Sequence, residues 1–177
     1  MSDFLDPTYE VPASGANYMK LKDGENKFRI LSKPIVGWID WKDKVPHRFI
    51  MTAKPEKPFD ASKPIKHFWS FIVFDYADRG VKILEITQAT IQNDIKNLSK
   101  DPEWDAPFSY DLKITRTGKE KETKYAVIPS PKKDLSDEIK KLALDKPCNL
   151  EALYSGGDPW VITDNKYTEP FFISMPF

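Results

Sequence analysis

Several residue types that dedicated chemistry requires are scarce in this sequence. Its 177 residues include one cysteine, Cys148, and two histidines, His47 and His67. A single cysteine excludes an internal disulfide, and these three side chains cannot complete a tetrahedral Cys/His zinc site. No apolar run approaches the ~18 residues of a membrane span, and the N-terminus lacks the basic-then-apolar pattern of a secretory signal. We therefore expect a soluble, intracellular protein with no membrane partner, no metal and no cofactor.

Net charge is absent as well, because 27 lysines and arginines balance 27 aspartates and glutamates. The positive charges are nevertheless clustered. Residues 20–66 carry 12 Lys and Arg against 6 Asp and Glu, and residues 113–133 carry 7 against 2. Residues 1–19, 67–112 and 134–177 are correspondingly acidic. Any argument for a polyanionic partner such as nucleic acid therefore depends on where these two basic segments lie in the fold.

Aromatic residues are plentiful, at 13% of the chain, and 15 prolines stand against 7 glycines. This composition is typical of a strand-rich domain with stiff connections. Apolar alternation, turn residues and helical spacing together predict the order of elements. The expected elements are a long strand over 25–41 bent near Pro34 and Gly37, a basic loop over 42–66, a hairpin over 67–87, a helix over 88–100, a second hairpin over 108–130 and a helix over 134–146.

Five strands with a helix between the third and the fourth is the element order of the OB-fold, a partly open five-stranded barrel. We therefore predict a mainly β OB-fold domain over residues 20–133, preceded by an acidic arm over 1–19. A C-terminal helix over 134–153 and an irregular tail over 154–177 are expected to follow. A small β-sandwich is the alternative, but it does not explain the inserted helix. The OB-fold binds oligonucleotides or oligosaccharides through strands two and three and the loops L12 and L45, and these loops fall in the two basic segments.

Aromatic side chains near the basic segments are candidates to stack on nucleic-acid bases, since every base has a π-face. Trp38 and Trp41 flank the end of the first strand, beside Lys42 and Lys44, and at least one of the two tryptophans is the best stacking candidate. The candidate nucleic-acid-binding residues are Trp38, Trp41, Lys42, Lys44, Arg48, Phe74, Tyr76, Lys113, Arg116, Lys119, Lys121, Lys124 and Tyr125.

Strand alternation divides the aromatic residues of the first hairpin between two faces. The residues expected on the core face are Trp69, Phe71, Val73, Leu84 and Ile86. Phe68, Phe74 and Tyr76 are expected to point outward on the more polar face. There they either stack on bases or lie beneath the ends of the chain.

No catalytic signature stands out in the chain. P-loop, dinucleotide-binding and ligase-like Lys-x-Asp-Gly patterns are all missing from the sequence. Neither histidine has a serine or cysteine in a nucleophile-elbow context nearby. Asp101, Glu103 and Asp105 have the spacing of possible metal ligands, but the residues between them suit a helix exit. We expect a binding protein rather than an enzyme.

Five stretches carry a family resemblance: NYMKLKDGENKFRILSKPIVGW, KHFWSFIVFDY, VKILEITQATIQ, PFSYDLKITRTG and YAVIPSPKK. This pattern of apolar and aromatic positions over residues 17–133 resembles the single-stranded DNA-binding proteins that tailed bacteriophages encode for replication and recombination. The resemblance implies an OB-fold protein in the host cytoplasm that coats and protects transient single strands without reading their sequence. An OB-fold module that binds protein or oligosaccharide, without a DNA role, is the alternative function.

The C-terminal tail has two interpretations. The chain ends in Met175, Pro176 and Phe177, similar to the Pro-Phe tip of bacterial single-strand binders. The resemblance therefore implies that Phe177 recruits replication or recombination proteins. Alternatively, Phe171 and its aromatic neighbours pack on the domain as a stabilising strap, because an exposed cluster of such residues invites aggregation.

Overall fold

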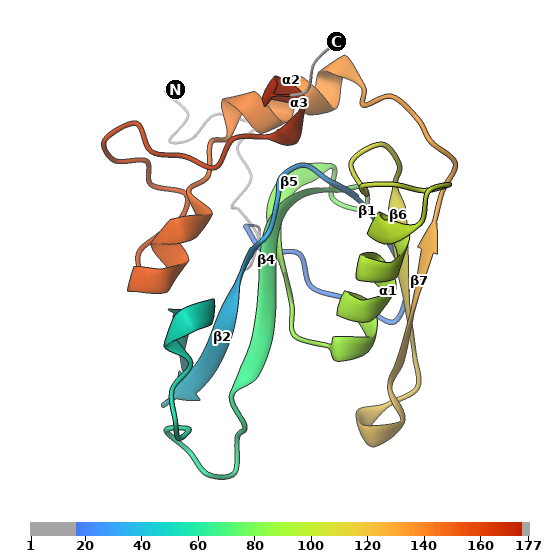
Figure 1. Ribbon diagram of the computed structural model, residues 1–177. Helices are drawn as coiled ribbons and strands as arrows, with labels where there is room; N and C mark the ends of the chain where they lie inside the picture. The colour runs from blue at the N-terminus through green and yellow to red at the C-terminus, as the bar shows by residue number, and fades with distance from the viewer. Residues whose placement is uncertain (1–16, 175–177) are drawn as a thin grey trace, which may run out of the picture.

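Seven strands form one antiparallel sheet in the computed structural model, which describes residues 17–174. The strands are β1 (Gly24–Ile30), β2 (Ile35–Lys42), β3 (Val45–Ile50), β4 (Lys66–Asp75), β5 (Gly80–Ile86), β6 (Leu112–Thr117) and β7 (Lys124–Pro129). The helices are α1 (Ala89–Lys100), α2 (Asp137–Asp145) and α3 (Phe171–Ser174), and the 3₁₀ turns are η1 (Met51–Ala53), η2 (Glu120–Glu122) and η3 (Leu150–Ser155). Figure 1 shows their arrangement.

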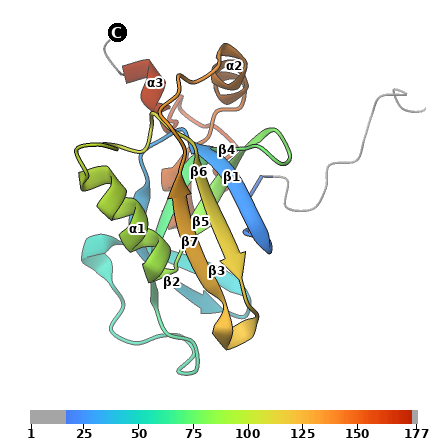
Figure 2. The same ribbon diagram turned by 90° about the vertical axis from the view of Figure 1, so that its right-hand side faces the viewer.

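The strand order is β3-β2-β4-β1-β6-β7, and β5 pairs with the other edge of β4. The predicted mainly β class and the helix between the first and second predicted hairpins are confirmed. The sheet has seven strands rather than five, however, and it is not closed into a barrel. Within residues 17–174 no ladder joins β5 to β7, and α1 lies alongside β7 instead (Figure 2).

Most of the predicted acidic arm, residues 1–16, and the C-terminal tip, residues 175–177, lie outside the described residues. The last residues of the arm pair with β5. The Met19 N–H donates to the Ile83 carbonyl at 2.8 Å, and the Ile83 N–H donates to the Asn17 carbonyl at 2.9 Å. These bonds attach the end of the arm to the sheet.

The strand predicted over 25–41 is present as two segments, β1 and β2, that lie along the same neighbour. β1 pairs with residues 73–75 of β4, and β2 pairs with residues 66–70. Pro34 separates the two segments, as expected of a residue that has no N–H to donate. Gly37 does not interrupt the strand. It lies inside β2, where any side chain would collide with a backbone carbonyl of β3.

The predicted basic loop over 42–66 contains a strand near its start, β3, which the sequence did not indicate because the prolines of this segment favour a loop. β2 and β3 are joined by a two-residue turn at Asp43 and Lys44, whose φ angles are 50° and 67°. Positive φ at both positions is what a tight hairpin turn of type I′ requires. Pro46 is tolerated because β3 is an edge strand, paired only with β2 among the described residues.

Two apolar clusters cover opposite faces of the sheet. On the face that we call inner, α1 contributes Ile91 and Ile95 to a cluster with Phe28 and Leu112. The predicted core residues Phe71, Val73, Leu84 and Ile86 are all buried in this cluster, and Trp69 packs against it. On the face that we call outer, residues 134–173 cover a second cluster, which includes Ile72 and Ile83.

Phe68 and Phe74 have no exposed surface, which decides between their two predicted roles, stacking on bases and burial beneath the ends of the chain. Phe74 belongs to the outer cluster, beneath the C-terminal segment. The Phe68 ring lies 6.2 Å from the ring of Tyr154 in η3. A fully buried ring cannot stack on a base, which removes Phe74 from the candidate stacking residues. Burial beneath a distant part of the chain, the alternative interpretation, is the one confirmed.

The C-terminal segment is a strap rather than a free tail. Residues 134–153 form α2 and the start of η3 instead of one helix. The Phe171 N–H donates to the Leu31 carbonyl at 2.9 Å, and the Phe171 ring stacks on Phe108 at 4.5 Å. Phe108 lies before β6, which begins at Leu112 and not at 108 as predicted.

Candidate nucleic-acid interface

A row of aromatic rings extends the inner face from the core onto the β2–β3 hairpin. Trp69 and His67 are two residues apart on β4 and therefore share a face. Trp38 of β2 lies opposite His67 on one side and opposite Phe49 of β3 on the other. The ring centroids of Trp38 and His67 are 5.2 Å apart. We call Trp69, His67, Trp38 and Phe49 the aromatic row, and all four are partly exposed.

His67 fixes the orientation of the row through its two ring nitrogens. Nδ1 donates to the Gly37 carbonyl at 2.8 Å, and Nε2 accepts from Trp69 Nε1 at 3.2 Å. This pattern requires the neutral tautomer with its proton on Nδ1. Trp38 is held similarly, since its Nε1 donates to the Met51 carbonyl at 3.1 Å. The ring nitrogens of His67, Trp69 and Trp38 thus make hydrogen bonds at the ring edges, and none of these bonds involves a ring face.

Lysine ammonium groups lie over two rings of this region. Lys54 Nζ is 4.2 Å from the centroid of the Trp38 ring, and Lys42 Nζ is 5.5 Å from that of Phe59. The Phe59 N–H donates to the buried carboxylate of Asp40 at 2.9 Å, which anchors the connection between β3 and β4. Cations and π-faces are thus adjacent, as binding of both the phosphates and the bases of a single strand requires.

The two tryptophans predicted as alternatives point to opposite faces of β2. Trp38 lies on the inner face with Lys42, whereas Trp41 is an odd number of residues away and lies on the outer face. Arg48 shares the outer face, where its Nε forms an ion pair with Glu85 at 2.7 Å. Because its guanidinium is paired with Glu85, Arg48 would have to break this ion pair to contact a phosphate. Trp38 is therefore the stronger stacking candidate.

The second basic segment forms the β6–β7 hairpin. Lys119, Lys121 and Lys124 are exposed in its turn and at the start of β7. Lys42 and Lys44 are likewise exposed at the turn of the β2–β3 hairpin. Both hairpins project toward the end of the molecule that lies opposite α2 and α3 (Figures 1 and 2). The structure therefore brings the two predicted basic segments to one end of the fold.

Tyr125 and Arg116, also predicted as binding residues, point inward from this hairpin. Tyr125 packs against the inner cluster. Arg116 Nη1 donates to the Leu21 carbonyl at 3.1 Å, and Arg116 Nε lies 3.6 Å from Asp23. The packing of Tyr125 agrees with the packed-aromatic role that its sequence position also allowed, whereas Arg116 is engaged with Leu21 and Asp23.

Lys113 and Tyr76 lie on the outer face, away from the aromatic row. Lys113 is opposite Lys27 of β1, and the Lys27 ammonium lies 4.6 Å from the Tyr76 ring centroid. The Tyr76 hydroxyl donates to Asp111 at 2.7 Å. Burial, reinforced by that hydrogen bond, raises the pKa of Tyr76 well above its ordinary value. Tyr76 is thus a fixed structural donor rather than an open stacking surface.

Sequence reasoning missed four contributors to this site. It assigned Trp69 entirely to the core, gave His67 no binding role and did not single out Phe49 or Lys54. The available signal was the alternation of Trp69 and His67 along one strand, which places both on one face. The contact between Lys54 and Trp38 spans 16 positions and a turn, and no periodic pattern indicates it.

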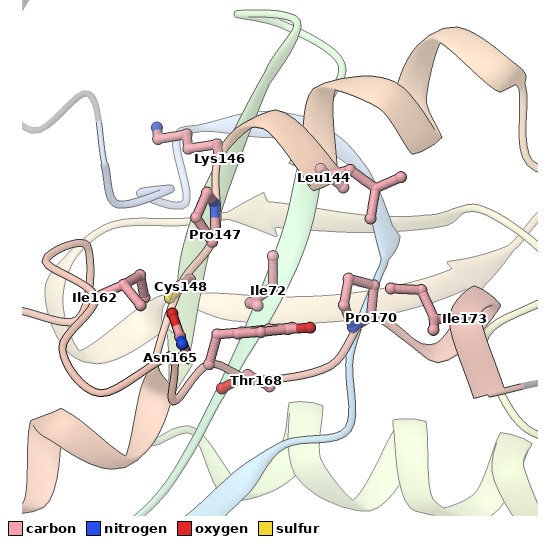
Figure 3. Close-up of a pocket in the computed structure, with 12 residues that line it drawn as sticks. Ile72, Leu144, Lys146, Pro147, Cys148, Ile162, Asn165, Thr168, Pro170 and Ile173 are labelled. Atoms are coloured by element: carbon pink, nitrogen blue, oxygen red, sulfur yellow. The ribbon is translucent and has the colours of Figure 1, made fainter.

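A cavity of about 300 Å³ lies under the C-terminal segment, with Ile72 of β4 on one side and Pro147, Cys148 and Thr168 on the other (Figure 3). Burial raises the pKa of the Cys148 thiol to about 12. At neutral pH Cys148 is therefore a protonated thiol and not a nucleophilic thiolate. Lys146 Nζ donates to the Val81 carbonyl at 2.9 Å. All of the residues that line the cavity, except Ile72, belong to the C-terminal segment.

Over residues 17–174, no cluster of three or more His, Cys, Asp or Glu side chains is arranged to hold a metal ion. The same part of the chain contains no helix with the length and apolar character needed to cross a bilayer. Comparisons with protein-family models, with curated proteins and with solved structures gave no match.

Proposed function

We propose that the protein binds single-stranded DNA without sequence preference, through the aromatic row and the two basic hairpins. The observation that carries this proposal is the Trp38 site, where a partly exposed ring lies 5.2 Å from His67 and 4.2 Å beneath the Lys54 ammonium. Stacking on such a ring requires an unpaired base, because the bases of a duplex are already stacked on one another. Lysines at the same place supply the sequence-independent attraction for phosphates.

The proposal extends to the fold family and the biological role. We propose that the sheet is an open relative of the OB-fold, supported by the position of α1 between β5 and β6. The resemblance of residues 17–133 to phage single-stranded DNA-binding proteins supports a role in phage replication or recombination, in the host cytoplasm. Recruitment of replication proteins by Phe177 belongs to this proposal and concerns a residue outside the described part of the chain.

A salt titration of oligo-dT binding tests the proposal. For single strands, log K falls by about 0.7 per unit of log salt for each phosphate contacted, so three to five contacts predict a slope of about −2 to −3.5. Charge reversal of Lys119 and Lys121 should make this slope shallower by up to about 1.4. Reversal of Lys140 and Lys141, on α2 at the opposite end, should leave the slope unchanged.

A flat salt response, or tighter binding to duplex than to single strands, would contradict a DNA-binding role. Weak salt dependence together with binding to a neutral oligosaccharide or a protein would favour the alternative OB-fold function.

A further inference from the structure

A second cavity, of about 320 Å³, opens beside Trp69 at the core end of the aromatic row. It lies between β4, α1 and the bend that joins β1 to β2. Its walls include Phe71 and Ile95 from the inner cluster, together with Phe108. Because Trp69 lines the cavity and also belongs to the row, the cavity is continuous with the proposed path of the bases.

The hydroxyl groups that line this cavity are already engaged. Ser32 Oγ donates to the Lys33 carbonyl at 3.0 Å and accepts from the Ile72 N–H at 3.0 Å. Ser99 Oγ donates to the Lys96 carbonyl at 2.7 Å. Trp69 Nε1 is bonded to His67, as described above. A ligand in the cavity therefore meets apolar contacts, and it would lose any hydrogen bonds that its inserted edge made to water.

Two exposed lysines, Lys33 and Lys96, stand at this apolar cavity. An apolar interior with cations beside it suits a ligand that is apolar at one edge and carries negative charge nearby. A base within a DNA strand has phosphates on both sides, which the two ammonium groups can approach. An apolar side chain of a partner protein would leave this charge unexplained.

We propose that the cavity receives the C5-methyl edge of one thymine of the bound strand, an inference that rests on the proposed DNA-binding function and adds a modest thymine preference at one position of an otherwise sequence-independent site. The C5–C6 side of thymine carries only a methyl group and a C–H. Its polar atoms O2, N3 and O4 lie on the rest of the ring and can stay in water. Purines carry the N7 acceptor on the corresponding edge, which the cavity would leave unpaired. Cytosine has the same C5–C6 side but lacks the methyl group.

Oligonucleotides that differ only in this methyl group provide the test. Affinities of the full-length protein for oligo-dT and oligo-dU, and for oligo-5-methyl-dC and oligo-dC, are measured at one salt concentration. Burial of one methyl group corresponds to about a fourfold gain in affinity. We expect the methylated member of each pair to bind about fourfold more tightly.

Substitutions at Ser99 separate the cavity from general stacking. Ser99 is exposed on α1, so Ser99→Leu adds volume toward the cavity without disturbing the core. This variant should bind oligo-dU normally but lose the preference for oligo-dT. The matched control Ser99→Ala removes the same hydroxyl without filling the cavity and should keep the preference. Unchanged melting temperatures establish that both variants are folded.

Equal affinity for dT and dU in the wild-type protein would overturn the thymine proposal and leave DNA binding intact. A methyl preference that survives Ser99→Leu would also overturn it, because the methyl group would then act elsewhere, such as at Trp38. Failure to bind any of the four oligonucleotides would instead overturn the proposed function itself.

Discussion

The two faces of the sheet carry aromatic residues from the same strands but use them differently. On the outer face, Phe68 and Phe74 of β4 are fully buried beneath residues 134–173. On the inner face, His67 and Trp69 of the same strand remain partly exposed, because α1 covers only the core end of this face. Strand alternation decides which face a residue joins. Whether that face meets solvent is decided by segments far away in the sequence.

The outer face should respond to the loss of a single strap residue. Phe171→Ala removes a buried ring that stacks on Phe108 at 4.5 Å. Substitutions of this kind cost about 3–5 kcal/mol. For a domain of this size each kcal/mol lowers the melting temperature by about 2–4 °C, so a decrease of about 6–20 °C is expected by calorimetry.

Ile173→Ala is the matched control for the strap, because Ile173 lies on the same short helix and is 45% exposed. Its melting temperature should stay within about 1–2 °C of wild type. If both variants melt alike, the strap does not stabilise the fold. If Phe171→Ala weakens DNA binding at a temperature where the protein is fully folded, the two faces are not functionally separate.

Removing the Trp38 ring from the inner face should weaken DNA binding without lowering the stability of the fold. Trp38→Ala is expected to weaken oligo-dT binding by about 1–3 kcal/mol, the usual contribution of one stacked base. The salt slope should not change, because no phosphate contact is lost. Trp41→Ala, at the neighbouring tryptophan on the outer face, should change affinity by less than about twofold, and equal losses in both variants would contradict the assignment of faces.

Local patterns in the sequence predict the elements of this fold well. The strand at 67–76, the helix at 88–100 and the hairpin turn after residue 117 are all present close to the predicted positions. Each depends on residues close together in the chain, such as the alternating apolar positions of β4. The strand β3 was missed because its proline suggests a loop, and only its position at the sheet edge makes that proline acceptable.

The candidate site could be predicted only in part, for a different physical reason. The charge excess of residues 20–66 and 113–133 marked the two segments that contain these hairpins, although residues 42–66 were predicted to be a loop. Whether Arg48 is paired, and whether Phe74 and Tyr125 are buried, depends instead on contacts with residues distant in sequence, such as Glu85 for Arg48. A short sequence pattern contains no information about those contacts. The exposed lysines were therefore easier to predict than the buried or paired members of the site.

The smallest expected effect tests how a base gains access to the inner face. In the unbound protein the Lys54 ammonium lies 4.2 Å from the Trp38 ring centroid, where a base would stack. A base that takes this position displaces a cation–π contact worth about 0.5–1 kcal/mol, and it frees Lys54 to approach a phosphate. Lys54→Ala removes both the cost of displacement and the phosphate contact.

These two consequences of Lys54→Ala depend differently on salt, so the binding curves of variant and wild type should cross. The phosphate contact weakens with salt, and its loss should make the slope of log K against log salt shallower by about 0.7. At low salt the variant should bind oligo-dT a few-fold more weakly than wild type. At high salt it should bind as tightly or more tightly, because the base no longer displaces a cation.

Lys57→Ala, at an exposed lysine of the same connection, is the control that isolates the ring contact. This lysine has no ring contact within residues 17–174, so its loss can reduce only the electrostatic attraction. Its binding curve should approach the wild-type curve at high salt without passing above it. If the Lys54→Ala curve behaves in the same way, Lys54 acts only as a surface charge. A crossing seen for Lys54 alone would instead mean that in the free protein a single side chain covers the Trp38 ring, and that the bound strand displaces it.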